Sequence, residues 1–230
     1  MKLAIFDLDD TLVNFAATRE IAYRRLAEHL DAQGVDSVAF GQVCPAMDRQ
    51  LFARFEQGHL SRTEYRLRRF SEPLAAIGVV PENTLVDQLN RIFMDCVNDA
   101  PLLFDDVLPL LQRLRSLDIR TAILTNGPSD GQRRKLKATG LGDCVDHVAI
   151  GEEVGFSKPS PLAFHSVVER FSLVNSDALM VGDSPELDYD AALKAGLKAL
   201  LLDRHHRHGD PGRASIRSLE AVWPHSEKEG

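Results

Sequence analysis

The N-terminal segment, residues 2–12 with the sequence KLAIFDLDDTL, constrains the fold more than any other part of the chain. Its residues 3–6 are apolar without alternation, which predicts a short strand buried on both faces of a parallel sheet. Asp7, Asp9 and Asp10 follow directly. Carboxylates grouped in this way repel one another, and burying them is costly unless another charge offsets them. The segment therefore predicts a hard-cation site at the carboxyl end of a strand, or alternatively an acidic turn.

Composition limits the classes of protein that the chain can represent. A length of 230 residues suits one large domain or a core domain with an insertion. The net charge of -7 argues against a nucleic-acid polymer as partner, although a metal ion and a lysine can still make a local cleft attractive to phosphate. Three widely spaced cysteines without a CxxC pair fit a reduced, cytoplasmic protein. No apolar run approaches the roughly 20 residues that span a bilayer, so we expect no membrane partner.

Residues 14–100 carry a helical pattern and no convincing strand. Apolar residues recur at helical spacing, and Ser61-Arg62-Thr63-Glu64 has the form of a capping box at a helix start. The pattern predicts four helices, at 16–32, 40–57, 61–77 and 81–98. We therefore expect residues 14–100 to form an all-helical domain inserted directly after the first strand.

Residues 101–230 alternate between short apolar runs and helical patterns. The predicted strands are 119–124, 145–150, 178–181 and 199–202, and the predicted helices include 186–194 and 216–222. This alternation is typical of right-handed crossovers and a parallel sheet covered on both faces. The first strand must join that sheet, because one buried strand cannot stand alone. We thus expect an α/β core domain made of residues 1–13 and 101–230.

Polar residues suited to phosphate chemistry follow several of the predicted strands. Thr125 and Asn126 follow the second strand, Asp183 follows the fourth, and Lys158 precedes a proline-rich helix start. In a parallel sheet these strand ends share one edge, so the side chains can converge. Carboxylates for a metal, a hydroxyl and amides for phosphate oxygens, and one lysine are the groups that phosphoryl transfer requires.

These residues resemble the four motifs of the haloacid dehalogenase-like (HAD) hydrolase superfamily, in order. The matching segments are DLDDT at 7–11, TN at 125–126, Lys158, and GDSPELD at 182–188. The resemblance covers nearly the whole core domain and implies a Rossmann-like fold. The helical insertion resembles the first class of cap in that superfamily. TNG at 125–127, EEVG at 152–155 and MVGD at 180–183 look most similar to the nucleotidase and sugar-acid phosphatase branch.

The resemblance implies catalytic roles for three residues. Asp7 would be the nucleophile that forms an aspartyl-phosphate. Asp9 would protonate the leaving alkoxide and then take a proton from the water that hydrolyses the intermediate. Lys158 would steady the nucleophile and the charge of the phosphoryl group.

The resemblance also implies the ligands of the phosphate and of a metal ion. Thr125 and the backbone amide of Asn126 would hold phosphate oxygens. Mg²⁺ would be bound by the Asp7 carboxylate, the Asp9 backbone carbonyl and Asp183, and Asp188 would orient metal-bound water. Mn²⁺ and Co²⁺ are alternatives, because both occupy oxygen-rich Mg²⁺ sites.

The function expected from this resemblance is a phosphomonoesterase acting on a small phosphorylated metabolite. A nucleoside monophosphate is the first expectation, and sugar or sugar-acid phosphates and a phosphomutase reaction are alternatives. Dehalogenases of the superfamily typically carry tyrosine two positions after the nucleophile, whereas this chain has Asp9, so dehalogenation is disfavoured. A non-catalytic binding module is disfavoured as well, because none of the motif residues is missing. We expect a monomer or a homodimer.

Other polar residues have simpler interpretations. We expect Asp10 to serve a local turn and Asp190 to lie on the surface. The histidines at 205, 206 and 208 are expected to be solvated loop residues rather than metal ligands. The basic residues of 129–139 are expected to form a solvated helix face: Arg133, Arg134, Lys135 and Lys137.

Overall fold

The structure is a computed structural model and describes residues 1–205 and 212–222. The chain forms two compact units, and each is described by itself. Met1–Phe15 and Pro101–Gly230 make the first, which we call the core unit. Ala16–Ala100 make the second, the helical unit.

The core unit is built on a six-stranded sheet in which every neighbouring pair of strands is parallel. The strands lie in the order β3-β2-β1-β4-β5-β6. Their bounds are β1 Leu3–Phe6, β2 Arg120–Thr125, β3 His147–Ile150, β4 Ala178–Gly182, β5 Lys198–Leu202 and β6 Ser215–Ile216. Strand β1 therefore joins the sheet, as predicted, and lies between β2 and β4. The parallel α/β sheet predicted from the sequence is confirmed.

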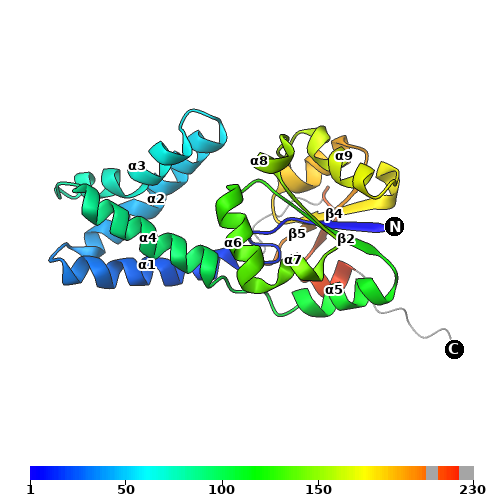
Figure 1. Ribbon diagram of the computed structural model, residues 1–230, viewed down its shortest axis with the longest axis horizontal. Coiled ribbons are helices and arrows are strands. Elements are labelled where there is room, and N and C mark those ends of the chain that lie inside the picture. Colours follow the sequence, from blue (N-terminus) through cyan, green and yellow to red (C-terminus); the bar gives the residue numbers. More distant parts are fainter. Residues whose placement is uncertain (206–211, 223–230) are drawn as a thin grey trace. The chain divides into compact units, whose positions relative to one another are not determined.

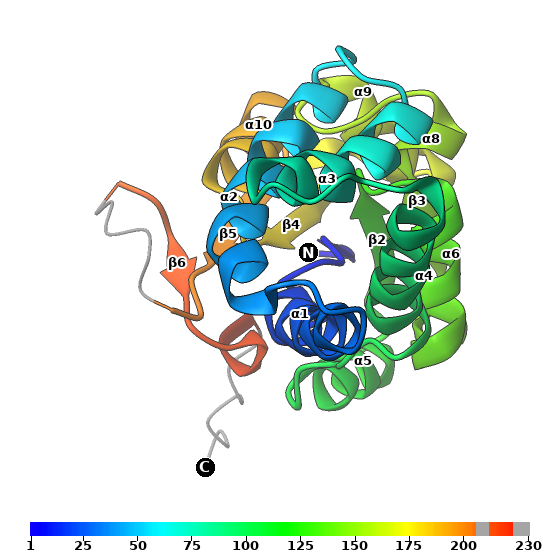
Figure 2. The same ribbon diagram turned by 90° about the vertical axis from the view of Figure 1, so that its left-hand side faces the viewer.

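Helices cover both faces of the sheet, and successive residues of β1 point to opposite faces. Ala4 and Phe6 pack with α5 (Val107–Ser116), α6 (Ser129–Thr139) and the 3₁₀ turn η3 (Leu219–Val222). Leu3 and Ile5 pack against α9 (Pro161–Arg170) and α10 (Ala191–Lys194). Figures 1 and 2 show α5 and α9 on opposite sides of the strands. Burial on both faces explains why β1 is apolar throughout, without alternation.

Two helices expected in the core unit form different elements in the structure. The single helix expected at 186–194 is a π-helix, η2 (Pro185–Asp190), followed by α10. The carbonyl of Ser184 accepts hydrogen bonds from the backbone N–H groups of both Asp188 and Tyr189, which widens that turn. The helix expected at 216–222 is β6 followed by η3, because the Asp106 carboxylate accepts the N–H of Leu219 and holds a tight turn there. The remaining short helices are α7 Leu141–Cys144, α8 Gly151–Val154 and η1 Asn175–Asp177.

The helical unit is made from four helices: α1 Phe15–Ala32, α2 Ser37–Glu56, α3 Arg62–Ala76 and α4 Asn83–Asp99. The capping box at the start of α3 forms as the sequence predicts. Ser61 Oγ accepts the N–H of Glu64 at 3.2 Å, and the Glu64 carboxylate accepts the N–H of Ser61 at 2.8 Å. Phe70 is fully buried between Phe40 and Phe93, so aromatic side chains form the centre of this unit.

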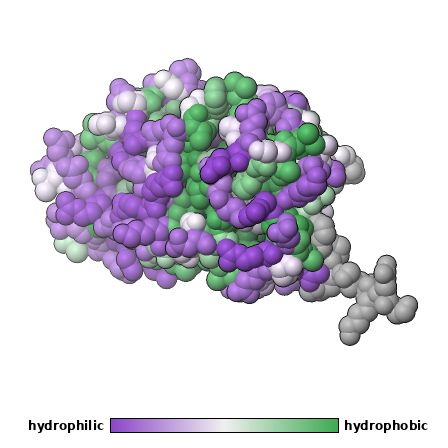
Figure 3. Space-filling view, turned by 45° about the vertical axis from the view of Figure 1, so that its right-hand side comes forward, coloured by the Kyte–Doolittle hydropathy of each residue, from purple (hydrophilic) through white to green (hydrophobic). Residues whose placement is uncertain are grey.

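The face of the molecule drawn in Figure 3 is mainly hydrophilic, with smaller hydrophobic patches between the hydrophilic residues. Within the part of the chain that the structure describes, none of the helices combines the length and the apolar character that crossing a membrane requires.

Candidate active site

The order of the strands places the predicted site residues at one edge of the sheet. Asp7 follows β1, Thr125 ends β2 and Asp183 follows β4, and these three strands are neighbours. The backbone N–H of Asp7 donates to the Val181 carbonyl at 3.0 Å, which extends the pairing of β1 and β4 to the first aspartate. The carboxyl ends of parallel strands are the usual ligand-binding edge of such a sheet.

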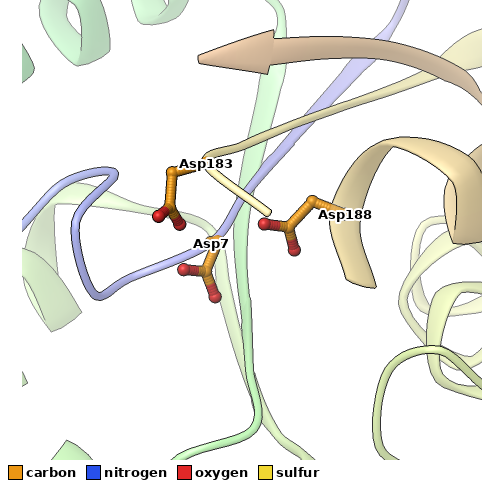
Figure 4. Close-up of side chains that lie close together, drawn as sticks. All are labelled: Asp7, Asp183 and Asp188. Carbon is orange, nitrogen blue, oxygen red and sulfur yellow. The ribbon is translucent and has the colours of Figure 1, made fainter. Parts of the chain in front are cut away.

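Asp7, Asp183 and Asp188 form one acidic cluster. Each offers a carboxylate oxygen, and these three oxygens lie within 4.8 Å of one another. Figure 4 shows the three side chains directed toward a common region from β1, from the end of β4 and from η2. Gly182 makes the approach of Asp188 possible, because a Cβ at this position would lie 2.2 Å from Asp188 Oδ2. The glycine of the GDSPELD segment is thus required by packing.

Lys158 reaches the same cluster. Its ammonium donates to Asp7 Oδ1 and to Asp188 Oδ1, each at 2.6 Å, and its side chain is 3% exposed. The side-chain amide of Asn126 fixes the backbone of Lys158 by donating to its carbonyl at 2.7 Å and accepting its N–H at 2.9 Å. The side chain of Asn126 therefore positions Lys158, a contact that the sequence motif does not suggest.

Two carboxyl groups of the cluster, those of Asp7 and Asp183, have raised pKa values. Burial raises the pKa of Asp7 well above its ordinary value; Lys158 acts against this shift, and Asp188 and Asp183 add to it. Burial also raises the pKa of Asp183 to about 7, with further contributions from Asp188 and Asp10. For Lys158 burial acts to lower the pKa, but the carboxylates of Asp188 and Asp7 outweigh it and hold the pKa above its usual range.

A divalent cation fits this donor set. Three carboxylates and one ammonium carry a formal surplus of two negative charges, which one divalent ion neutralises. Carboxylate oxygens are the ligands that hard cations such as Mg²⁺ prefer. Burial raises the pKa of both Asp7 and Asp183, and a cation bound beside them would favour their charged forms.

Asp9 lies outside the acidic cluster and has different partners. Lys135 Nζ donates to Asp9 Oδ1 at 2.5 Å, and Gln132 Nε2 donates to Asp9 Oδ2 at 2.9 Å. Both donors belong to α6. Although Asp7 and Asp9 are only two positions apart, the fold gives them separate environments, one at Lys158 and the other at α6.

The expectation of a solvated basic face on α6 is wrong for Lys135. Lys137 is exposed and Arg133 pairs with Glu153, but Lys135 is buried, with its ammonium 4.6 Å from the centre of the Phe15 ring. Gln132 was not considered as a site residue from the sequence. A signal was present, since Gln132 and Lys135 share one helix face with the buried Leu136.

Thr125 is buried at the end of β2, and its hydroxyl accepts a hydrogen bond from Gln132 Nε2 at 2.7 Å. Gly127 makes room for this amide, because a Cβ there would lie 2.2 Å from Gln132 Nε2. The TNG segment thus contains three structural features: a hydroxyl at the site, the amide that positions Lys158, and a glycine that admits Gln132.

The other polar residues singled out from the sequence are not members of the acidic cluster. Asp10 has a positive φ of 57°, as in a turn, and its N–H donates to the carbonyl of Val13. Asp190 forms two hydrogen bonds with the guanidinium of Arg213. His205 is exposed, whereas the histidines at 206 and 208 lie outside the described residues.

The fold and the arrangement of these residues define a class of enzyme, and sequence comparison gives the same class. The family sequence model of the haloacid dehalogenase-like hydrolases matches residues 1–196 of this chain. The chain belongs to this family, and it is therefore a hydrolase.

Three relatives match almost the whole chain. YfnB of Bacillus subtilis is 29% identical, with 95% of this chain and 92% of the relative covered. A phosphoserine phosphatase of Thermus thermophilus is 30% identical, with 92% of each chain covered. The pyrimidine 5′-nucleotidase YjjG of Escherichia coli is 29% identical, with 94% and 92% covered.

Solved structures give the same fold. The crystal structure of YfnB bound to magnesium superposes with a TM-score of 0.78 at 26% identity and covers 96% of both chains. A 2-haloacid dehalogenase of Pseudomonas syringae superposes with a TM-score of 0.67, also at 26% identity and with 96% of both chains covered. The family thus includes both phosphate-ester and carbon–halogen chemistry among its solved structures and relatives, and the site has to distinguish them.

Proposed function

We propose that this enzyme is a Mg²⁺-dependent phosphomonoesterase that hydrolyses a small phosphorylated metabolite through an aspartyl-phosphate. The observation that carries the proposal is the separation of two nearby carboxylates. Asp7 is buried beside Lys158 and the acidic cluster, whereas Asp9 is held by Gln132 and Lys135. A nucleophile and a proton donor need different environments, and Asp7 and Asp9 have different environments in this site.

In the first step, a carboxylate oxygen of Asp7 forms a bond to phosphorus while the bond from phosphorus to the ester oxygen breaks. The departing oxygen takes a proton from Asp9 and leaves as an alcohol. Lys158 donates to Oδ1 of Asp7, so this carboxylate is held in one orientation for the attack. Thr125 and the backbone amide of Asn126 supply donors for the phosphoryl oxygens.

In the second step, water attacks the phosphorus of the aspartyl-phosphate and gives a proton to the carboxylate of Asp9. The bond between phosphorus and Asp7 breaks, which restores the Asp7 carboxylate and releases inorganic phosphate. The sum of both steps is hydrolysis of the ester by one water. Asp9 acts first as an acid and then as a base, and so returns to its starting state.

Mg²⁺ would be held by the carboxylates of Asp7 and Asp183 and by the backbone carbonyl of Asp9, with Asp188 beside them. Mn²⁺ and Co²⁺ suit the same oxygen donors. When bound, the ion supplies positive charge against the phosphoryl oxygens and the nucleophile. Support comes from the surplus negative charge of the cluster and from the magnesium-bound structure of the relative YfnB.

A nucleoside monophosphate is our first proposal for the substrate. The similarity to the pyrimidine 5′-nucleotidase YjjG supports it, and the similarity to a phosphoserine phosphatase supports phosphomonoesters more broadly. Sugar and sugar-acid phosphates are the alternatives, together with a phosphomutase reaction. Dehalogenation is disfavoured because a halide leaves without a proton, so it gives no reason to hold a carboxyl group such as Asp9 beside the nucleophile.

The experiment that tests this proposal measures phosphate release from a panel of nucleoside, sugar and amino-acid phosphates, with Mg²⁺ or with EDTA. We expect Mg²⁺-dependent release by the wild type and its loss in Asp7→Asn. Asp190→Asn is the matched control, because Asp190 lies outside the cluster and pairs with Arg213. Chloride release from 2-chloropropionate without phosphatase activity would overturn the proposal in favour of dehalogenation. Interconversion of phosphorylated isomers without free phosphate would overturn it in favour of a mutase.

A further inference from the structure

The two α6 residues that contact Asp9 form a clamp around its carboxylate. Lys135 reaches Oδ1 and Gln132 reaches Oδ2, so each oxygen has its own donor. The two residues are three positions apart and lie on the same helix face. Both are nearly inaccessible, with exposed fractions of 4% and 1%. A donor pair of this kind restricts the rotation of the Asp9 side chain much more than one solvated contact would.

Lys135 is buried in contact with Asp9 and Phe15. A lysine is seldom fully buried unless it is paired, and its ammonium pairs with Asp9 while it lies over the ring of Phe15. Ordering a long side chain in a buried position costs conformational entropy, and an exposed ion pair contributes little free energy to offset that cost. The Lys135–Asp9 pair differs from a surface pair because the side chain of the lysine is only 5% exposed, although the side chain of Asp9 is 30% exposed, so solvent screens the pair in part.

Gln132 also fixes the polarity of the Thr125 hydroxyl. The Gln132 amide nitrogen has two protons, and it donates one to Asp9 and one to Thr125 Oγ1. Since the carboxylate of Asp9 accepts, the group that faces it must be the amide nitrogen and not the amide oxygen. Thr125 must then accept from that nitrogen, which leaves its own proton to be donated elsewhere. The same glutamine thus orients both Asp9 and a predicted phosphate donor.

We propose that Gln132 and Lys135 are positioning residues for the acid–base carboxylate Asp9, and that Lys135 stabilises the negative charge that Asp9 acquires when it protonates the leaving alkoxide. This inference rests on the proposed function, because it assumes that Asp9 exchanges the proton. As the proton passes from Asp9 to the ester oxygen, a carboxylate forms 2.5 Å from an ammonium. The attraction is greatest at that stage, so it favours the transition state over the ground state.

The leaving group of the substrate provides the test. An alkyl phosphate needs a proton on its departing oxygen, whereas p-nitrophenyl phosphate releases a stable phenolate without one. We compare kcat/KM for the best alkyl phosphate of the panel with kcat/KM for p-nitrophenyl phosphate. A variant that changes folding or phosphate binding alters both values equally, so the ratio of the two values is unaffected by such changes. The variant is Lys135→Met, which keeps the apolar stem beside Phe15 and removes the ammonium. Lys137→Met on the exposed side of the same helix is the control.

We expect Lys135→Met to lower kcat/KM for the alkyl phosphate by about 10- to 100-fold, within the roughly 10²- to 10⁴-fold range of general acid catalysis. The aryl phosphate should change by less than about threefold, and Lys135→Arg should restore part of the loss. In an Asp9→Asn background, Lys135→Met should cause little further loss, because residues that act as one unit are not additive. Gln132→Met is a second variant, and it should show the same selectivity for the alkyl ester.

The possible results separate failure of the inference from failure of the proposed function. Equal losses on both esters, an unchanged alkyl ester, or a full further loss in the Asp9→Asn background would overturn the positioning role alone. Absence of Mg²⁺-dependent phosphate release by the wild type, or an Asp9→Asn variant without preference for the aryl ester, would overturn the proposed function and the inference with it.

Discussion

The metal-free protein should lose stability as the pH rises, because the fold places Asp183 where its charged form is disfavoured. Burial, followed by the carboxylates of Asp188 and Asp10, raises its pKa from 3.8 to about 7. A carboxyl group with a raised pKa in the folded state contributes stability that is fully present below the pKa of the unfolded chain and is lost as the pH rises through the folded value. The window of loss is therefore about pH 4 to 7.

The size of the effect follows from the same values. A shift of about three pKa units, at 1.36 kcal/mol each, corresponds to about 4 kcal/mol of unfolding free energy across the whole window. Between pH 5 and pH 7 we expect a loss of about 2 kcal/mol, or roughly 4 to 8 °C in melting temperature for a chain of this length. Saturating Mg²⁺ should remove most of this loss, because a cation favours the charged carboxylates.

The assay is thermal unfolding in EDTA and in Mg²⁺ at several pH values between 5 and 8. Asp183→Asn should reduce the decline seen in EDTA, because the amide does not ionise, and the part that remains should come from Asp7, whose pKa burial also raises. Asp190→Asn should keep the wild-type decline, since Asp190 pairs with Arg213 outside the cluster. An Asp183→Asn variant with the wild-type slope, or a stabilisation by Mg²⁺ that is equal at pH 5 and pH 8, would refute the reasoning.

Three further predictions concern individual residues. Lys158→Met leaves two buried carboxylates without their cation, so chemical denaturation in EDTA should show a loss of about 3 to 5 kcal/mol; a loss below about 1 kcal/mol would contradict the ion-pair geometry. Gly182→Ala places a Cβ 2.2 Å from Asp188 Oδ2 and so displaces the Asp188 carboxylate. Calorimetry should then give Mg²⁺ binding weaker by about 10- to 100-fold, and unchanged binding would count against Asp188 as a supporting residue. Ser61→Ala removes the cap of α3 and should cost about 1 kcal/mol by urea denaturation, whereas a neutral result would mean that the cap is dispensable.

The sheet could be predicted from the sequence because its strands are buried on both faces. The apolar runs that end at Asp7, at Thr125 and at Gly182 have no helical periodicity, and each is followed directly by polar residues. Order along the chain and the right-handed crossover rule then place these strand ends on one edge. The acidic cluster with Lys158 follows from that edge, and the structure brings its members together.

The clamp on Asp9 could not be predicted in the same way, because the basic residues of α6 fit a solvated helix face as well as a buried contact. Four basic residues within one short helix are typical of a solvated face, and the partner of Lys135 lies 126 positions away in the chain. Only the packing of α6 against the β1 side of the sheet separates the buried Lys135 from the exposed Lys137. The contact of Asn126 with the backbone of Lys158 was missed for a similar reason, since a motif gives residue types but not the atoms that meet.

The central place of β1 has a consequence for the folding of the chain. Its partners, β2 and β4, begin 117 and 175 positions after Leu3, with the whole helical unit in between. Pairings between such distant segments carry a large loop-closure cost, and they form slowly compared with local helical contacts. Helix α3 contacts both α2 and α4, its neighbours in sequence. The helical unit can therefore gain structure before β1 pairs with β2 and β4. Asp7 is thus among the first residues of the site to be synthesised, but it reaches its final position only after β4 has been made.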